Sequence, residues 1–127
     1  MAGPVLIIED DPDIAECLRY GLESAQLEAR VALTGEEGLL ASLDTERPPR
    51  LILLDILLPG MSGVEICRRL RRESLTRTIP IILMSAKGSP EDIARLEVGA
   101  NDYIGKPFSI KEVVRRIDSL LSSAEIS

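Results

Sequence analysis

The chain has 127 residues, of which 45% are hydrophobic and 28% charged, and its formal net charge is −6. This length fits one ordinary folded domain. The acidic balance argues against non-specific binding to nucleic acid, because such binding depends on Lys and Arg neutralising phosphates. The chain contains no histidine, which excludes a histidine base, a histidine metal ligand and a phosphohistidine of its own.

Compartment and redox state can also be predicted. No apolar run reaches the ~18 residues of a membrane span, and the N-terminus lacks the basic start and long apolar core of a signal peptide. We therefore expect no membrane segment and a cytoplasmic location. Cys17 and Cys67 both lie in segments with a helical pattern. We expect them to be reduced thiols, buried or half-buried, and not a disulfide.

The chain begins with a strand pattern and then a helix pattern. Val5–Ile8 is a short continuous apolar run, which is typical of a strand covered on both faces. Asp11 and Pro12 follow as a helix cap and a first-turn proline. The apolar residues of the predicted helix then recur at helical spacing, at Ile14, Leu18, Leu22 and Ala25.

A second pair of elements follows in the same order. Residues 27–33 alternate between apolar and polar, which predicts a short strand. Thr34 and Glu37 form a candidate capping box, which predicts a helix extending to about Leu43. The apolar positions of this predicted strand are Leu27, Ala29, Val31 and Leu33.

The middle of the chain contains the most apolar run. Leu51–Leu54 reads as a third strand, and it ends at a carboxylate, Asp55. Pro59-Gly60 marks a turn, and a capping box over residues 62–65 opens the next helix. The apolar positions of that helix are Val64, Ile66, Cys67 and Leu70.

The last third contains two more strand patterns. Ile79–Met84 is a fourth apolar run, followed by Ser85. Residues 89–99 are predicted to form a helix, with Gly99 as its C-terminal glycine. Asp102–Ile104 is a short fifth strand, and a capping box over residues 109–112 opens the last helix. Apolar residues lie along one side of that helix, at Ile110, Val113, Val114, Ile117 and Leu120.

The strand–helix order repeats five times, which predicts an α/β fold with a parallel sheet covered on both faces. Right-handed crossovers then give a doubly wound domain of the flavodoxin-like type, with strand order 2-1-3-4-5. We expect one domain over residues 1–127, with its core at about 4–122. There is no internal linker or repeat.

Polar residues collect where the predicted strands end. In a parallel sheet these carboxyl ends share one edge, where ligands bind. Taken singly, each residue has a simpler structural interpretation. Asp11 would be a helix cap, and Glu9 and Asp10 would be solvated acids in a loop. Ser85 would be a turn residue and Lys106 an ordinary surface lysine. Asp55 fits a purely structural interpretation least well, because it follows four aliphatic residues. The residues that we expect at this edge are Glu9, Asp10, Asp11, Asp55, Ser85 and Lys106.

Such a cluster predicts phosphoryl chemistry. Neighbouring carboxylates repel unless a cation joins them, and oxygen ligands suit Mg²⁺ or Mn²⁺. A lysine opposite the metal would help to stabilise the oxygens of a phosphoryl group. An aspartate can act as the nucleophile and form an acyl phosphate, and Asp55 is the natural candidate.

Four motifs in this sequence resemble those of the receiver domain of two-component response regulators. They are Ile-Ile-Glu-Asp-Asp at residues 7–11, Leu-Leu-Asp-Ile-Leu-Leu-Pro-Gly-Met-Ser-Gly at 53–63, Met-Ser-Ala at 84–86 and Asp-Tyr-Ile-Gly-Lys-Pro-Phe at 102–108. The resemblance extends from Val5 to about Leu121.

This resemblance implies that Asp55 accepts a phosphoryl group from a phosphohistidine on a sensor histidine kinase or a histidine phosphotransfer protein. Mg²⁺ would be bound by Asp10 and Asp55 directly, by Glu9 through water, and by the backbone carbonyl of Leu57. The domain would be a signalling switch that catalyses only its own phosphorylation and dephosphorylation.

The resemblance also implies the parts of the switch. Lys106 would pair with the phosphoryl group, and the Lys106–Pro107 bond is typically cis in this family. Ser85 occupies the position of the family's Thr or Ser and would move toward the phosphoryl oxygen. Tyr103 occupies the position of the aromatic residue that turns inward in response.

The 102–109 segment resembles receivers joined to winged-helix DNA-binding domains. Those receivers form homodimers through the fourth helix, fifth strand and fifth helix, and the receiver itself does not contact nucleic acid. Asp92 departs from the family pattern, because those relatives usually carry a basic residue near there. The charges available for a dimer are Asp102, Glu112, Arg115 and Arg116.

Two other functions share parts of this pattern. A Mg²⁺-dependent aspartyl-phosphate phosphatase would use the same acids, but it usually has a second acid two residues after the nucleophile, where this chain has Leu57. A receiver-like adaptor would bind partners without phosphorylation, and the complete set of acids argues against it.

Overall fold

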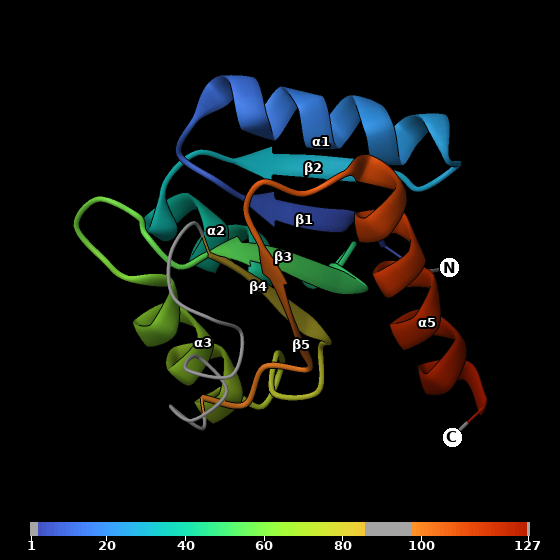
Figure 1. The fold of residues 1–127 in the computed structure, drawn as a ribbon. Helices are drawn as coiled ribbons and strands as arrows, with labels where there is room; N and C mark the ends of the chain where they lie inside the picture. Colours follow the sequence, from blue (N-terminus) through green and yellow to red (C-terminus); the bar gives the residue numbers. More distant parts are fainter. Residues whose placement is uncertain (1–2, 86–97, 127) are drawn as a thin grey trace.

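The computed structural model describes residues 3–85 and 98–126, with side chains up to residue 122. The described residues form a five-stranded parallel sheet with strand order β2-β1-β3-β4-β5, as predicted (Figure 1). The strands are β1 Val5–Ile8, β2 Ala29–Ala32, β3 Leu51–Asp55, β4 Ile81–Ser85 and β5 Asp102–Gly105; the helices are α1 Pro12–Ser24, α2 Gly35–Ser42, α3 Gly63–Arg72 and α5 Ile110–Ile126.

Helices cover both faces of the sheet. Helices α1 and α5 pack on one face, and α2 and α3 pack on the other (Figure 1). The central strand β3 reaches both cores, because successive side chains point to opposite faces of a strand. Leu51 and Leu53 lie in the α1–α5 core, whereas Ile52 and Leu54 lie in the α2–α3 core, and all four are fully buried.

Four helices begin at the caps that the sequence predicts. The Asp11 carboxylate accepts hydrogen bonds from the backbone N–H groups of residues 13 and 14. The Thr34, Ser62 and Ser109 hydroxyls each accept one from the residue three positions later. Each cap satisfies a backbone donor that the first turn leaves without a partner. These caps therefore fix the residue at which each helix begins.

Two details of the predictions are wrong. The second strand was predicted over residues 27–33, but β2 spans only Ala29–Ala32, and Leu33 lies beyond its end and is 39% exposed. Cys17 was predicted to be buried or half-buried, but it is exposed, because it lies off the apolar stripe of α1. Cys67 is buried as expected, and both thiols are free. The helix predicted over residues 89–99, with Asp92, lies largely outside the described residues.

A half-buried arginine joins the end of α3 to the sheet. Arg71 donates hydrogen bonds to the carbonyls of Ile79 and Gly99 and to the Asn101 side chain, each at 2.8 Å. The Asn101 oxygen also accepts from the backbone N–H of Ile81, at 2.9 Å. This network fixes the start of β4 and the approach to β5. Among the described residues, no helix is both long and apolar enough to cross a membrane.

Candidate functional site

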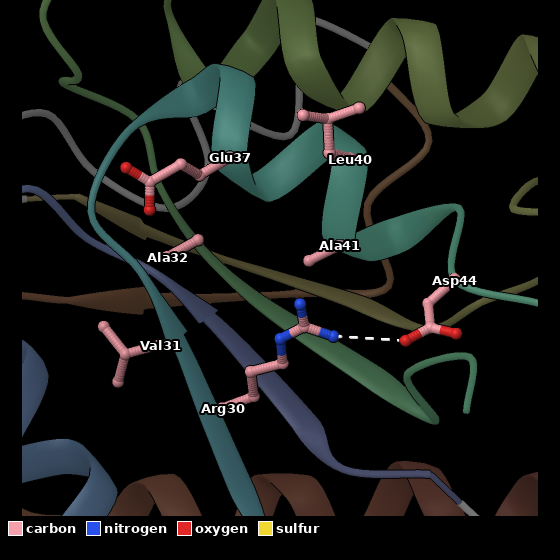
Figure 2. A pocket seen from close by; sticks show the side chains of 7 residues that line it. All are labelled: Arg30, Val31, Ala32, Glu37, Leu40, Ala41 and Asp44. Atoms are coloured by element: carbon pink, nitrogen blue, oxygen red, sulfur yellow. Dashed lines mark hydrogen bonds and ion pairs between the residues drawn. The ribbon is translucent and has the colours of Figure 1, made fainter. Parts of the chain in front are cut away.

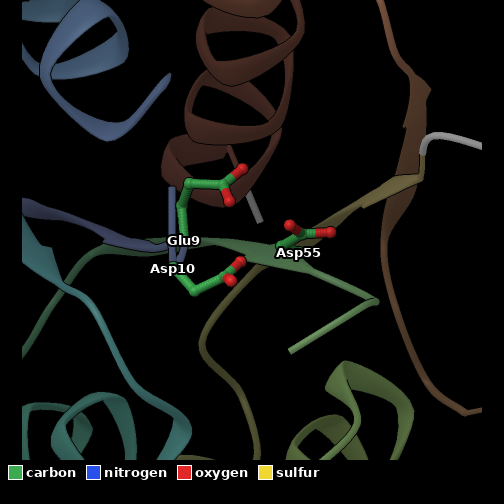
Figure 3. A group of neighbouring side chains, drawn as sticks. All are labelled: Glu9, Asp10 and Asp55. Carbon is green, nitrogen blue, oxygen red and sulfur yellow. The ribbon is translucent and has the colours of Figure 1, made fainter. Parts of the chain in front are cut away.

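The predicted polar residues meet at one edge of the sheet. Glu9 and Asp10 follow β1, Asp55 ends β3, and Lys106 follows β5. The parallel register aligns these ends: Ile8 pairs with Leu54 in the ladder between β1 and β3. Figure 3 shows the carboxylates of Glu9, Asp10 and Asp55 facing a common space. The topology therefore brings together residues that are up to 97 positions apart.

One ammonium group joins two buried carboxylates. Lys106 Nζ lies 2.7 Å from Glu9 Oε1 and 3.0 Å from Asp55 Oδ2. Glu9 is 1% exposed and Asp55 is 4% exposed, so water screens these charges weakly. A buried charge is tolerated when it is paired and hydrogen-bonded, and Lys106 meets that requirement for both acids.

The pKa shifts follow from burial and from this pairing. Burial raises the pKa of Glu9 above its ordinary value, although the hydrogen bond from Lys106 opposes the rise. Burial alone would lower the pKa of Lys106, but its hydrogen bonds to Glu9 and Asp55 outweigh that effect, so its pKa is raised. Lys106 is therefore held in its charged form by the two carboxylates.

The acidic cluster has the composition of a divalent metal site. One carboxylate oxygen from each of Glu9, Asp10 and Asp55 lies within 4.8 Å of the others. Three carboxylates against one ammonium leave excess negative charge, and oxygen ligands are those that Mg²⁺ and Mn²⁺ prefer. The cluster could therefore hold such an ion. Asp11, by contrast, is exposed and caps α1.

The loop after Asp55 is shaped by hydrogen bonds and glycine. The backbone N–H of Leu57 donates to Asp55 Oδ1 at 3.2 Å, which orients the carboxylate, while the Leu57 residue is 63% exposed. Gly60 has a φ of +81°, in the region that favours glycine. At Gly63 a Cβ atom would lie 2.2 Å from the Asp55 carbonyl oxygen. The start of α3 can therefore approach the Asp55 backbone only with glycine there.

Ser85, Tyr103 and Lys106 lie on the two neighbouring strands. Ser85 is buried at the end of β4, and its carbonyl accepts a hydrogen bond from the Lys106 backbone N–H at 2.7 Å. Tyr103 is half-buried and packs against the α2–α3 core, and burial raises the pKa of its hydroxyl. The Lys106–Pro107 peptide bond is cis.

The residues at this edge are predictable from the sequence, but two of their contacts are not. These are the direct Glu9–Lys106 ion pair and the close approach of Gly63 to Asp55. The Gly63 contact left one signal in the sequence, a glycine at the first position of a helix. Glycine weakens a helix, so its presence there suggests a packing reason.

The fold and this site define a class of protein. The family model of the response regulator receiver domain matches residues 5–118, so the chain belongs to that family. It is the receiver domain of a two-component response regulator, which is a signalling switch. The family implies a histidine kinase as partner.

Its relatives include transcriptional regulators. The chain is 46% identical over 118 residues to the phosphate regulon transcriptional regulatory protein PhoB of Pseudomonas aeruginosa, covering 92% of this chain and 51% of that protein. It is 39% identical to the alkaline phosphatase synthesis regulatory protein PhoP of Bacillus subtilis, covering all of this chain and 52% of that protein. The chain therefore spans about half the length of these relatives.

Solved structures agree with this assignment. The receiver domain of the Francisella response regulator 1452 superposes with a TM-score of 0.85 at 31% sequence identity, and the match covers 96% of this chain and 98% of that one. The sheet order and the covering helices are thus those of a known receiver domain.

Proposed function

We propose that Asp55 accepts a phosphoryl group from a phosphohistidine on a histidine kinase or a histidine phosphotransfer protein. The observation that supports this most directly is Lys106 Nζ, which contacts Asp55 at 3.0 Å while a three-carboxylate cluster surrounds the same space. In the transfer, an Asp55 carboxylate oxygen forms a bond to phosphorus, and the bond from phosphorus to the histidine nitrogen breaks. The product is an acyl phosphate on Asp55 and a free histidine on the partner.

Each neighbouring residue has a role in this proposal. Asp10 and Asp55 would hold Mg²⁺ or Mn²⁺ directly, with Glu9 acting through water and the backbone carbonyl of Leu57 as a further ligand. When bound, the ion would offset the charge on the phosphoryl oxygens. Lys106 supplies a second cation on the opposite side, and its raised pKa keeps it protonated.

The response to phosphorylation would involve β4 and β5. Ser85 would donate its hydroxyl hydrogen to a phosphoryl oxygen, and Tyr103 would turn inward as Ser85 moves. The phosphoryl group would thereby favour one of two arrangements of these strands. Because serine lacks the methyl group of threonine, we expect Ser85→Thr to tighten the coupling between phosphorylation and Tyr103 burial.

The proposal extends to the whole domain. The receiver would occupy residues 1–127 with a core at about 4–122, would act in the cytoplasm, and would form a homodimer through the fourth helix, β5 and α5. Within one chain, Arg116 already pairs with Asp102 at 2.8 Å and with Glu112 at 2.9 Å. In such a homodimer these charges would be able to exchange partners across the interface.

Mass spectrometry tests the proposal. The chain is incubated with Mg²⁺ and acetyl phosphate, and its intact mass is compared with that of Asp55→Asn; Asp13→Asn serves as a control for loss of an exposed acid. We expect an adduct of about 80 Da, the mass of one phosphoryl group, on the wild type and the control only. An equal adduct on Asp55→Asn would refute Asp55 as acceptor. Turnover of many phosphate esters would favour the phosphatase, and no adduct would favour the adaptor.

A further inference from the structure

Strand β2 has an unpaired backbone edge. Among residues 3–85 and 98–126, it forms a ladder with β1 only, at the end of the sheet (Figure 1). The carbonyls of Glu28 and Ala32 accept hydrogen bonds from β1 and from the residue that follows it. Backbone groups alternate in direction along a strand, so those of residues 29 and 31 point away from β1. Their N–H and C=O groups can therefore pair with another strand.

The sequence of β2 does not protect this edge. Proteins usually protect an edge strand with charged side chains, proline or a bulge. The strand reads Ala-Arg-Val-Ala, so it contains no proline and Arg30 is its one charged residue. Arg30 lies on the α2 side of the strand and pairs with Asp44 at 3.3 Å (Figure 2). The guanidinium is thus directed toward α2 and leaves the edge open.

The α1 side of this edge carries apolar side chains. Ala29 and Val31 are partly buried and pack against the α1–α5 core. Leu33, the next residue in the same alternation, lies just beyond the strand and is 39% exposed. A second strand along the edge would cover these side chains, and the burial of their apolar surface would favour its binding.

The α2 side of the edge carries charges of both signs. A hollow of about 410 Å³ lies there, and Arg30, Ala32 and Glu37 are among its lining residues. Figure 2 shows Glu37 near Ala32, whereas Arg30 is joined to Asp44 further along the strand. Glu37 is exposed, and its carboxylate has no hydrogen bond or ion pair within the part of the chain described with side chains. The hollow thus presents a cation and an available acid.

We infer that β2 pairs in antiparallel orientation with β2 of a second copy of this chain, about a two-fold axis at Val31. The Val31 backbone N–H donates to the carbonyl of the partner's Val31, and its own carbonyl accepts the reciprocal hydrogen bond. In this register Ala29 lies opposite the partner's Leu33, which covers that exposed leucine. The contact uses the opposite edge of the sheet from β5, so it differs from the homodimer face proposed above.

The charges on the α2 side complement each other in this register. Arg30 lies opposite the partner's Ala32, and its guanidinium enters the hollow beside the partner's Glu37. The two-fold axis repeats this contact, because in such an interface each residue makes the same contact twice. Arg30 gives up an exposed ion pair with Asp44, and exposed pairs contribute little to stability.

The side chains favour a second copy over an unrelated peptide. Any extended peptide could form the backbone hydrogen bonds, because these bonds do not depend on sequence. An antiparallel β2, however, supplies an arginine where this chain has an available glutamate, and a glutamate where it has an arginine. It also places valine opposite valine, an aliphatic pair that stabilises neighbouring strands.

Sedimentation equilibrium of the unphosphorylated chain tests this inference. The interface formed by a four-residue strand is small, so the average mass should rise toward twice that of the monomer at concentrations up to about 1 mM. Arg30→Glu and Glu37→Arg should each weaken the dimer at least about tenfold, because each places like charges opposite one another. A wild type that stays monomeric over this range would overturn the inference.

Mixing the two charge reversals gives the sharpest result. Arg30→Glu carries two acids at the contact and Glu37→Arg carries two cations, so one copy of each is complementary at both contacts. We expect the mixture to form heterodimers although neither variant self-associates, and we expect Arg30→Glu/Glu37→Arg in one chain to dimerise like the wild type. Both single variants keep a net negative charge, so net charge would not attract them. A mixture that stays monomeric would refute the two-fold pairing.

Two more variants locate the contact in the fold. Val31→Pro removes an outward N–H, which an edge strand tolerates, and it should abolish the dimer. Arg115→Glu alters an exposed residue of α5, and its dimer Kd should stay within about twofold of the wild type. Loss of the dimer in Arg115→Glu but not in Arg30→Glu would place self-association at the other edge and refute the inference. Far-ultraviolet circular dichroism checks that each variant is folded.

Nuclear magnetic resonance separates the remaining occupant. The amide signals of residues 29–33 should shift as the wild-type concentration rises, and a synthetic peptide of residues 27–34 should shift the same signals. A scrambled peptide of the same composition should not shift them. Equal shifts with the scrambled peptide, in a chain that stays monomeric, would identify a general peptide site and overturn the second copy. No phosphodonor is present, so these outcomes are independent of Asp55.

Discussion

Asp10→Asn should make the domain more stable, and the size of the effect follows from the acidic cluster. Asp10 is half-exposed, and one of its oxygens lies within 4.8 Å of oxygens on Glu9 and Asp55. At that separation two unit charges repel by about 0.9 kcal/mol in the dielectric of water and by about 3.5 kcal/mol at an effective dielectric of about 20. Taking the lower value for each of two neighbours, less some attraction to Lys106, predicts a gain of about 1 to 2 kcal/mol.

Urea unfolding followed by far-ultraviolet circular dichroism measures this gain, since the chain has no tryptophan. With a urea m-value of about 1.5 kcal/mol/M, the unfolding midpoint should rise by about 1 M in the absence of Mg²⁺. Asp13→Asn, which removes an exposed acid outside the cluster, should change stability by less than about 0.5 kcal/mol.

Added Mg²⁺ should stabilise the wild type more than Asp10→Asn. At about ten times its dissociation constant, Mg²⁺ stabilises the wild type by about 1.4 kcal/mol, and Asp10→Asn should lose most of this effect. If Asp10→Asn is no more stable than the wild type without Mg²⁺, or if Mg²⁺ stabilises both equally, the acids do not act as one mutually repelling metal site.

Three other predictions follow from the same contacts. Lys106→Met should lower the free energy of unfolding by about 3 kcal/mol at pH 8, because two buried carboxylates lose their cation. The Lys106 pKa is raised above its ordinary value of 10.5, so the contribution of Lys106 to the free energy of unfolding is complete below pH 10.5 and is lost as the pH rises through the folded-state pKa. Unfolding measured as a function of pH should show this alkaline loss of stability in the wild type and not in Lys106→Met. Gly63→Ala should lower the free energy of unfolding by about 1–3 kcal/mol, because the new Cβ meets the Asp55 carbonyl oxygen. The new Cβ of Gly60→Ala meets no atom within 4 Å, so that variant should lose only about 1 kcal/mol, for its positive φ. Equal losses for the two variants in thermal unfolding would contradict the contact at Gly63. Arg71→Ala should cost about 2–3 kcal/mol in urea unfolding and the exposed Arg72→Ala less than about 0.5 kcal/mol, and similar values for the two would mean that the Arg71 network contributes little.

Much of the fold and the site is predictable because the signals are local. A short continuous apolar run such as Leu51–Leu54 specifies a buried parallel strand, and a cap such as Asp11 specifies where a helix starts. Once five such units are in order, topology alone brings their carboxyl ends to one edge. The acidic cluster then follows from residues that sit directly after strands.

The rest depends on contacts between residues far apart in the chain. The Arg71 network joins α3 to Asn101, thirty positions away, and no local pattern encodes it. Leu33 follows the alternation of its strand but is exposed, because β2 is at the edge of the sheet and ends one residue earlier. The exposure of Cys17 was also missed, since a cysteine suits either side of a helix and only the position of the apolar stripe decides.

Asp55 and Tyr103 lie on strands that should differ in rigidity, because β3 is central in the sheet and β5 is at its edge. Asp55 ends a strand that has a neighbour on each side and is anchored in both cores, so it should be the most rigid point of the domain, with the slowest amide exchange. Tyr103 belongs to an edge strand whose residues are mostly only partly covered. A chemical change at Asp55 should therefore produce more movement in the edge strand β5 than in β3.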